Sequence, residues 1–276
     1  MSYAHFLALF ILPALVLAVA AAALSIRIRG RTPIWRSGGI WLGVLLVVAL
    51  GWTTPWDSWI IHRGVWSYPP GSVTATLFGV PLEEYAFIAA QVLVVGAWTL
   101  VLLAGRVDGY DPRAPWPWAP AGLTRLAAAG LWLAIAVAGL VLAAASPRLL
   151  YLGSTLLWLG VPIALQRAAG ADVLHRFRTL RLIALLPVVY LWVADRVAIG
   201  HAAWQVSPAH TTGLLLAGLP IEEIVFFLAT SLLTVDGLVL ACHPAVEHRL
   251  SGLPGPLRTG PSPEGPLTPR LSQEAA

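Results

Sequence analysis

The sequence contains no lysine and no asparagine, and only one of its 276 residues is a cysteine, Cys242. Without a lysine, the chain cannot form the Schiff base that retinal proteins and pyridoxal enzymes require. A single cysteine leaves no partner for an internal disulfide and excludes a metal cage built from cysteines. The sequence also lacks a G-x-G-x-x-G turn, so a flavin or nicotinamide cofactor is not expected.

Charged residues are also scarce, at 11% of the chain, whereas a typical soluble domain has about 25%. Hydrophobic residues make up 58% and stand in long runs. A helix needs about 20 apolar residues to cross a bilayer, and seven segments are long enough. They run over 5–26, 36–55, 75–104, 122–145, 148–166, 180–199 and 211–241. We therefore predict an all-α integral membrane protein with seven transmembrane helices.

The basic residues are all arginines, apart from histidine, and they are unevenly placed. All but Arg63, Arg148 and Arg196 fall in the C-terminal tail or around the loops after the first, third and fifth predicted helices. Cytoplasmic loops of membrane proteins carry such an excess of arginine. The pattern predicts a multi-pass protein of the cell membrane, with the N-terminus outside and the C-terminus in the cytoplasm. Because topology explains the charge, binding to nucleic acid is not expected.

Two stretches of the sequence repeat one pattern. Asp57 precedes Trp66 by nine residues, and Asp195 precedes Trp204 by the same interval. A Pro-x-Glu-Glu motif follows each tryptophan, "PLEE" in the first copy and "PIEE" in the second. Helices one to three thus match helices five to seven, and the fourth helix is a connector. Because one helix joins them, the two repeats should have the same orientation and be related by an axis along the membrane normal.

This repeat divides the chain into four parts. We predict a first three-helix repeat over 1–104, a loop and connector helix over 105–147, a second repeat over 148–242, and a disordered cytoplasmic tail over 243–276. If the repeats face each other, their glutamate pairs should meet in the bundle interior.

The repeated motifs place two pairs of acids in apolar segments: Glu83 with Glu84, and Glu222 with Glu223. One interpretation is structural. If Pro81 and Pro220 are the first helical residues, the glutamates fall in the first turn, where they favour the helix dipole. The third helix would then begin at Pro81, and 72–80 would be a short interfacial or re-entrant piece. The other interpretation is functional, because ionisable groups inside a membrane are costly and two pairs occur in register.

The aspartates and tryptophans of the repeat also allow two interpretations. Asp57 and Asp195 each lie at the end of a predicted helix on the non-cytoplasmic side. Each is interpreted either as a cap or turn residue at the membrane surface or as a catalytic group. Most tryptophans fit an aromatic belt at the membrane surface. Trp66 and Trp204 differ because they repeat in register, and an indole face in a pocket can stabilise a cation.

A metal site is not expected from this sequence. His62 and His201 follow their aspartates at unequal spacings of five and six residues, and no H-x-x-H or H-E-x-x-H motif is present. Asp236, near the cytoplasmic end of the last helix, has no counterpart in the third helix. We interpret it as an interfacial residue.

Two classes of function fit these features. A transporter with parallel repeats would use the acids as proton or cation sites. An enzyme doing acid chemistry on a lipid would use them to donate and accept protons. The apolar, aromatic surroundings of the acids favour the enzyme, because a transporter of polar solutes should have more polar residues in its helices. Glutamine, for example, occurs only at 91, 166, 205 and 273.

The paired Asp-x8-Trp and Pro-x-Glu-Glu units are similar to the lycopene cyclase domain of the flavin-free, membrane-integral carotenoid cyclases. The chain resembles the form of that family in which two units are fused. The resemblance covers about 1–104 and 148–242. It implies that the chain cyclises the ends of lycopene, or of a related linear carotenoid, into ionone rings, with β-carotene or γ-carotene as the expected product.

The resemblance also implies roles for the repeated residues. A general acid protonates the terminal double bond, the neighbouring double bond attacks the resulting cation, and a base removes a proton whose position sets the ring type. The implied catalytic residues are Glu83, Glu84, Glu222, Glu223, Asp57 and Asp195. The implied substrate-binding residues are Trp66, Trp204, Phe87 and Phe226, and Pro81 and Pro220 belong to the structural motif.

Further expectations follow from this chemistry. No cofactor is expected, since no net redox change occurs. The expected partners are a linear carotenoid, the lipid bilayer and, through the pathway, other carotenoid enzymes. Neighbouring helical residues point about 100° apart, so one glutamate of each pair should face the substrate. We favour Glu84 and Glu223. Ring type, the number of ends cyclised and the substrate's chain length are not decided by the sequence.

Overall fold

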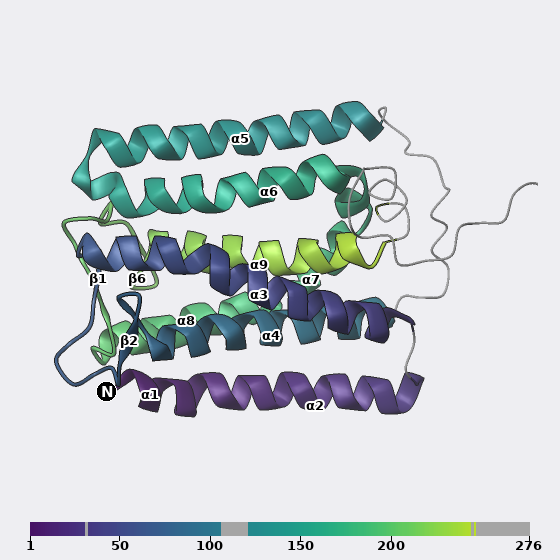
Figure 1. Cartoon of the computed structure of the whole chain (residues 1–276), viewed down its shortest axis with the longest axis horizontal. Helices are drawn as coiled ribbons and strands as arrows, with labels where there is room; N and C mark the ends of the chain where they lie inside the picture. Colours follow the sequence, from purple (N-terminus) through teal and green to yellow (C-terminus); the bar gives the residue numbers. More distant parts are fainter. Residues whose placement is uncertain (31–32, 106–120, 244–245, 247–276) are drawn as a thin grey trace, which may run out of the picture.

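The computed structural model describes residues 1–30, 33–105, 121–243 and 246. Within them, seven helical spans are long and apolar enough to cross a membrane. They lie side by side along the long axis of the molecule, as Figure 1 shows. This confirms the predicted all-α membrane fold. All of the predicted tail except residues 243 and 246, and most of the loop before the connector helix, lie outside the described residues.

The helices are as follows. The first span consists of α1 (Tyr3–Phe6), the π-helix η1 (Leu7–Ile11) and α2 (Leu12–Arg29). The next three are α3 (Pro33–His62), α4 (Leu82–Ala104) and α5 (Ala121–Ala145). The fifth span consists of the 3₁₀ helix η2 (Pro147–Leu149) and α6 (Leu150–Arg176). The sixth consists of α7 (Arg178–Ala184) and α8 (Leu186–Gly200), and the last is α9 (Ile221–Ala241).

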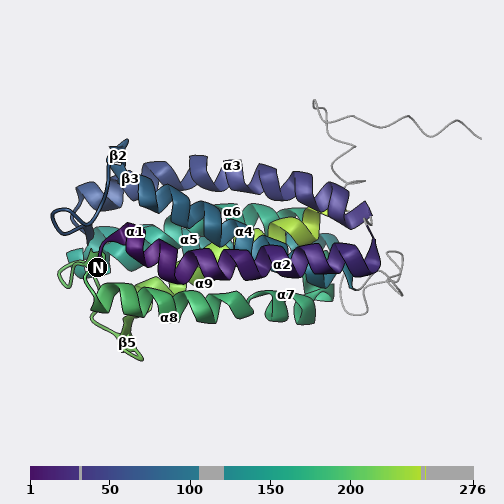
Figure 2. The same cartoon turned by 90° about the horizontal axis from the view of Figure 1, so that it is seen from below.

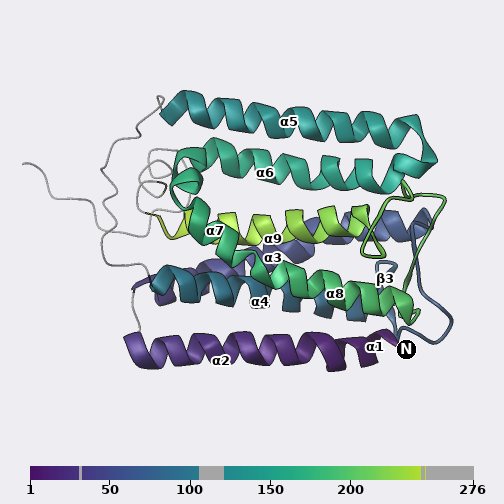
Figure 3. The same cartoon turned by 180° about the vertical axis from the view of Figure 1, so that it is seen from behind.

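Short antiparallel strands gather at one end of the bundle, beside the N-terminus (Figures 1 and 3). We call this the hairpin end. Strand β2 (Thr76–Leu77) pairs with β3 (Val80–Pro81), and β5 (Leu215–Leu216) pairs with β6 (Leu219–Pro220). Strand β1 (Trp66–Ser67) pairs with β4 (Gln205–Val206), so Trp66 lies opposite Val206. This last pair joins the two segments that carry the repeated motifs.

The hairpins correct two predicted helix boundaries, because the segments predicted over 75–104 and 211–241 become helical only at Leu82 and Ile221. In the first hairpin, Phe78 and Gly79 both have positive φ, 52° and 78°. Ala217 and Gly218 repeat this geometry, at 52° and 80°. Two successive left-handed residues make the tight turn of a two-residue hairpin and cannot continue a helix. Hydropathy alone does not detect such a turn.

The start of α4 agrees with the structural interpretation of the glutamates in one respect. Glu83 and Glu84 lie in its first turn, as Glu222 and Glu223 do in α9. Pro81 and Pro220 are one position earlier than expected, because each is the cap residue and not the first helical residue.

Helices α4 and α9 pack against each other and are the most buried spans of the described bundle. In Figure 2, α3 and α8 lie on opposite sides of the molecule. The connector α5 lies at an edge and packs mainly on α6 (Figure 1). The two backbones come so close there that no side chain fits between them. A Cβ added to Gly139 would lie 2.5 Å from the Gly153 carbonyl oxygen. Small residues permit this close approach of membrane helices.

Asp236, interpreted from the sequence as interfacial, is enclosed by the protein and not exposed at its surface. Its side chain is fully buried and forms salt bridges with Arg167, at 2.7 Å, and with Arg181, whose Nη2 lies 3.0 Å from Oδ2. These contacts join α6, α7 and α9 at the end opposite the hairpins. The burial follows from two arginines on other helices, which a reading of α9 alone does not reveal. Pairing reduces the cost of a buried charge.

Candidate active site

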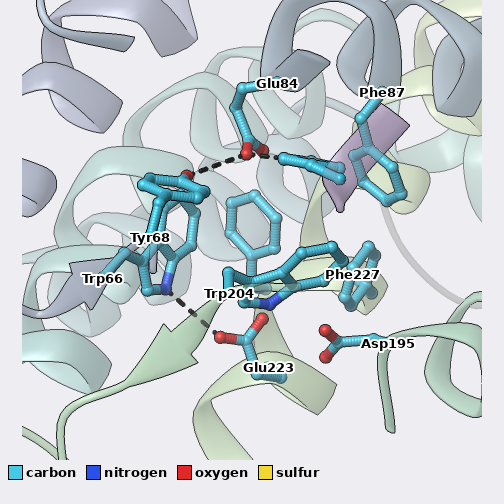
Figure 4. A pocket seen from close by; sticks show the side chains of 10 residues that line it. Trp66, Tyr68, Glu84, Phe87, Asp195, Trp204, Glu223 and Phe227 are labelled. Atoms are coloured by element: carbon cyan, nitrogen blue, oxygen red, sulfur yellow. Dashed lines mark hydrogen bonds between the residues drawn. The ribbon is translucent and has the colours of Figure 1, made fainter. Parts of the chain in front are cut away.

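A small pocket lies at the hairpin end, where α4 and α9 begin. Its walls come from α1, α4, α8, α9 and the segments that follow α3 and α8 (Figure 4). Its free volume is about 20 Å³, enough for about one water molecule. The lining residues are Tyr3, Trp66, Tyr68, Glu84, Phe87, Asp195, Trp204, Glu223, Phe226 and Phe227. Three carboxyl groups thus share one aromatic enclosure.

Glu84 is buried and accepts two hydrogen bonds on the same oxygen. Tyr3 Oη donates to Glu84 Oε2 at 2.9 Å, and Tyr68 Oη donates to it at 3.1 Å. Burial, and after it the Glu84 charge, raise the pKa of the Tyr68 phenol well above its usual value. Tyr68 therefore stays protonated and acts as the hydrogen-bond donor to Glu84. Two donors on one oxygen stabilise a carboxylate.

Glu223 has a matching environment in the other half of the sequence. Tyr151 Oη donates to Glu223 Oε1 at 2.9 Å, and Trp66 Nε1 donates to it at 3.3 Å. Like Tyr3, Tyr151 lies at the start of the first helical span of its half. The match is incomplete, because the residue two positions after Trp204 is Val206, where Tyr68 follows Trp66. Each glutamate therefore has one tyrosine donor in an equivalent position, Tyr3 or Tyr151, and a second donor that has no equivalent at the other glutamate.

Glu83 and Glu222 are buried but do not line the pocket. Glu83 Oε1 accepts from the Thr74 backbone N–H at 2.8 Å and from Thr74 Oγ1 at 2.5 Å. Glu222 Oε1 accepts from the Thr212 N–H at 2.6 Å. Both therefore tie the chain before a hairpin to the helix that follows it. The expected meeting of all four glutamates does not occur, because neighbouring side chains point about 100° apart on a helix.

The two aspartates are almost fully buried, each 1% exposed. Their carboxyl oxygens form no hydrogen bond with any described residue. Asp195 lines the pocket beside Glu223, and the Trp204 indole lies close to it without good hydrogen-bond geometry (Figure 4). Asp57 does not line the pocket but is close enough to Glu84 for their charges to interact.

Aromatic rings form most of the remaining wall. The four aromatics expected from the sequence all line the pocket: Trp66, Trp204, Phe87 and Phe226. Trp66 meets Phe226 edge-on, with ring centroids 5.7 Å apart and planes at 86°. An indole or phenyl face attracts a cation, so this wall suits a positively charged intermediate.

Sequence reasoning missed the tyrosines that hold the glutamates. Tyr3 precedes Glu84 by 81 residues, whereas Tyr151 precedes Glu223 by 72. The spacings differ mainly because the second span of the first half has 30 residues and its counterpart has 23, so aligning the two motifs does not reveal the tyrosines. Their position near the start of the first helix in each half was the available signal.

The histidines lie away from the pocket, since His62 and His201 are both exposed. Among the described residues, no group of three or more His, Cys, Asp or Glu side chains is arranged to hold a metal ion.

Comparisons with known proteins give a consistent result. The sequence model of the lycopene cyclase family matches residues 3–102 and 148–237. A lycopene beta-cyclase of Halobacterium salinarum is 35% identical over 246 residues, which cover 87% of this chain and 95% of the relative. The bifunctional lycopene cyclase/phytoene synthase of Phaffia rhodozyma is 31% identical over 229 residues, or 76% of this chain and 33% of that protein. No solved structure matches.

Proposed function

The chain belongs to the lycopene cyclase family, and we propose that its pocket closes the ends of lycopene into ionone rings. One observation carries this proposal. Three buried carboxyl groups, Glu84, Glu223 and Asp195, converge on an aromatic enclosure inside a membrane bundle. Such a site can protonate an apolar substrate and stabilise the cation that results.

The reaction is balanced without a redox partner. A carboxyl group adds a proton to the terminal double bond, which leaves a tertiary cation. The neighbouring double bond attacks this carbon, so a ring bond forms and the cation moves to a ring carbon. A carboxylate then removes a proton and a new double bond forms. One proton enters and one leaves, so the product is an isomer of the substrate.

The enclosure protects this intermediate from water. An exposed tertiary cation would be trapped as an alcohol, whereas Trp66, Trp204 and Phe226 present ring faces and edges and no nucleophile. The free volume of about 20 Å³ is too small for the end group of a carotenoid. The aromatic side chains must therefore move when the substrate enters, and they displace any water at that step.

The names of the relatives support the finer parts of the proposal. The Halobacterium relative is named a lycopene beta-cyclase, which supports β rings, and β-carotene or γ-carotene, as the product. In the Phaffia relative, one chain is named for both lycopene cyclase and phytoene synthase. That fusion supports contact between this protein and other enzymes of carotenoid synthesis. None of the named relatives supports the transporter hypothesis.

The arginine distribution supports an orientation with the N-terminus, and therefore the hairpin end, on the outer side of the membrane. A reporter enzyme fused after Cys242 should be active only on the cytoplasmic side, and a tag before Tyr3 should be labelled in intact cells. Labelling of the N-terminal tag only after cell lysis would reverse this orientation.

The cyclisation itself is tested by expressing the protein in bacteria that accumulate lycopene. We expect the cells to change from red towards yellow-orange, and chromatography of the pigments to show a cyclic carotene. An empty vector is the control, and immunoblotting of the membranes shows that the protein is present. Unchanged lycopene in membranes that contain the protein would refute the proposed function.

A further inference from the structure

We propose that Asp195 is the proton donor that starts ring closure and that Glu84, across the pocket, is the base that ends it. This assignment rests on the proposed cyclisation. It separates residues that the repeated motifs present as equivalent, and it follows from how the carboxyl groups are hydrogen-bonded and placed.

The hydrogen bonds distinguish a protonated acid from a carboxylate. Glu84 and Glu223 each accept two hydrogen bonds from tyrosine or tryptophan donors. Both oxygens of Asp195 are buried, and neither accepts a hydrogen bond from the described residues. A buried charge without donors is very costly, whereas a neutral carboxyl group costs far less. Asp195 is therefore the carboxyl group that holds a proton to give.

The carboxyl group next to Asp195 also favours a proton on Asp195. Glu223 lies beside it in the same wall, close enough for their charges to interact (Figure 4). Two carboxyl groups at short range in a buried site cannot both be ionised without a large repulsion. Since Tyr151 and Trp66 stabilise the charge on Glu223, the proton of the pair belongs on Asp195.

The placement of Glu84 suits the final step. Figure 4 shows its carboxylate on the other side of the pocket from Asp195, with aromatic rings between them. Proton addition and proton removal occur at different carbons of the end group, so donor and base must reach it from separate positions. Glu84 is held there by Tyr3 and Tyr68, and the latter donor has no counterpart at Glu223.

Asp57 offers a matched control for Asp195. It has the same place in the repeated motif, the same 1% exposure and the same lack of hydrogen-bond partners. It differs in place, because it does not line the pocket and its charged neighbour is Glu84, whereas Asp195 lies beside Glu223. A general structural cost of replacing a buried aspartate should therefore appear in both variants, and loss of the proton donor in only one.

The experiment measures two quantities in membranes supplied with lycopene: the turnover rate and the ratio of β, γ and ε rings. Turnover by the wild-type protein is read first, so failure of the proposed function is recognised separately. We expect Asp195→Asn to lose turnover by at least about 100-fold, as is typical of a lost general acid, with an unchanged ring ratio in the residual product. Asp57→Asn should lose much less.

Glu84→Gln should behave differently, because removal of the base acts after the ring has formed. We expect slower turnover together with a shifted ring ratio or with a cyclic alcohol from water capture. Equal losses in Asp57→Asn and Asp195→Asn would overturn the donor assignment. An unchanged ring ratio in Glu84→Gln would overturn the base assignment.

A second variant tests the donor role even if the Asp195→Asn protein accumulates poorly in the membrane. Asp195→Glu keeps an acid in the pocket, so we expect measurable turnover with the wild-type ring ratio. A shifted ring ratio in Asp195→Glu would contradict the donor role, since the donor acts before the ring type is decided.

Discussion

At the scale of single residues, adjacent glutamates have different surroundings. Glu83 receives two hydrogen bonds from Thr74 in the segment before the first hairpin, whereas Glu84 receives two from tyrosines in the pocket. The same division separates Glu222 from Glu223. Both interpretations of the motif therefore describe part of it, because one glutamate anchors a loop and the other faces the pocket.

Single glutamine substitutions should separate these roles. In Glu83→Gln and Glu222→Gln, the amide oxygen still accepts the loop N–H, so we expect a stability loss of about 1 kcal/mol and turnover near the wild-type value. Glu84→Gln should lose at least about 100-fold in turnover, because it removes the proposed base. Glu223→Gln should also lose turnover, because it removes the charge that keeps the proton on Asp195. Cyclic carotene per unit of membrane protein and thermal unfolding in detergent measure the two effects. Near wild-type turnover in all four variants would contradict acid catalysis by this pocket.

At the scale of helices, hydropathy predicted the number of spans and most of their extents, but not their interruptions. The segment 180–199 is divided into α7 and α8, and Pro187 stands at the start of α8 without an N–H to donate. The π-helix η1 ends two residues before Pro13, and the Phe10 carbonyl in it accepts a hydrogen bond from Tyr190 Oη at 2.6 Å. Both breaks lie beside prolines, but Pro55 stands inside the unbroken α3, so a proline in an apolar run does not by itself predict a break.

The sequence also does not show which helices contact each other. No sequence pattern pairs Trp52 with Trp158, yet each indole donates to the backbone carbonyl of the other, at 3.3 and 3.0 Å. This reciprocal contact joins α3 to α6, so a surface aromatic also connects the two halves. Because the motif pattern repeats, it predicted most of the acids and aromatics that line the pocket. The tyrosines that hold the acids repeat without a fixed spacing.

At the scale of the whole molecule, the two matched segments and the equivalent contacts agree with the predicted repeat. Tyr3 holds Glu84, and Tyr151 holds Glu223, each from the first span of its half. The division at 1–104, 105–147, 148–242 and 243–276 stays a prediction, as does the symmetry axis. What the sequence could not provide is the asymmetry of the pocket, because Asp195 lines it and Asp57 does not.

The pocket lies near the hairpin end and not midway along the spans, because Glu84 and Glu223 stand in the first turns of α4 and α9. If a linear carotenoid docks there with its polyene along the spans, its second end group lies far from the acids. In that case the molecule has to leave, turn end over end and dock again before both ends are cyclic. We expect a time course in membranes to show a monocyclic carotene rising and falling before the dicyclic product accumulates. Dicyclic product without a free monocyclic intermediate would contradict this order.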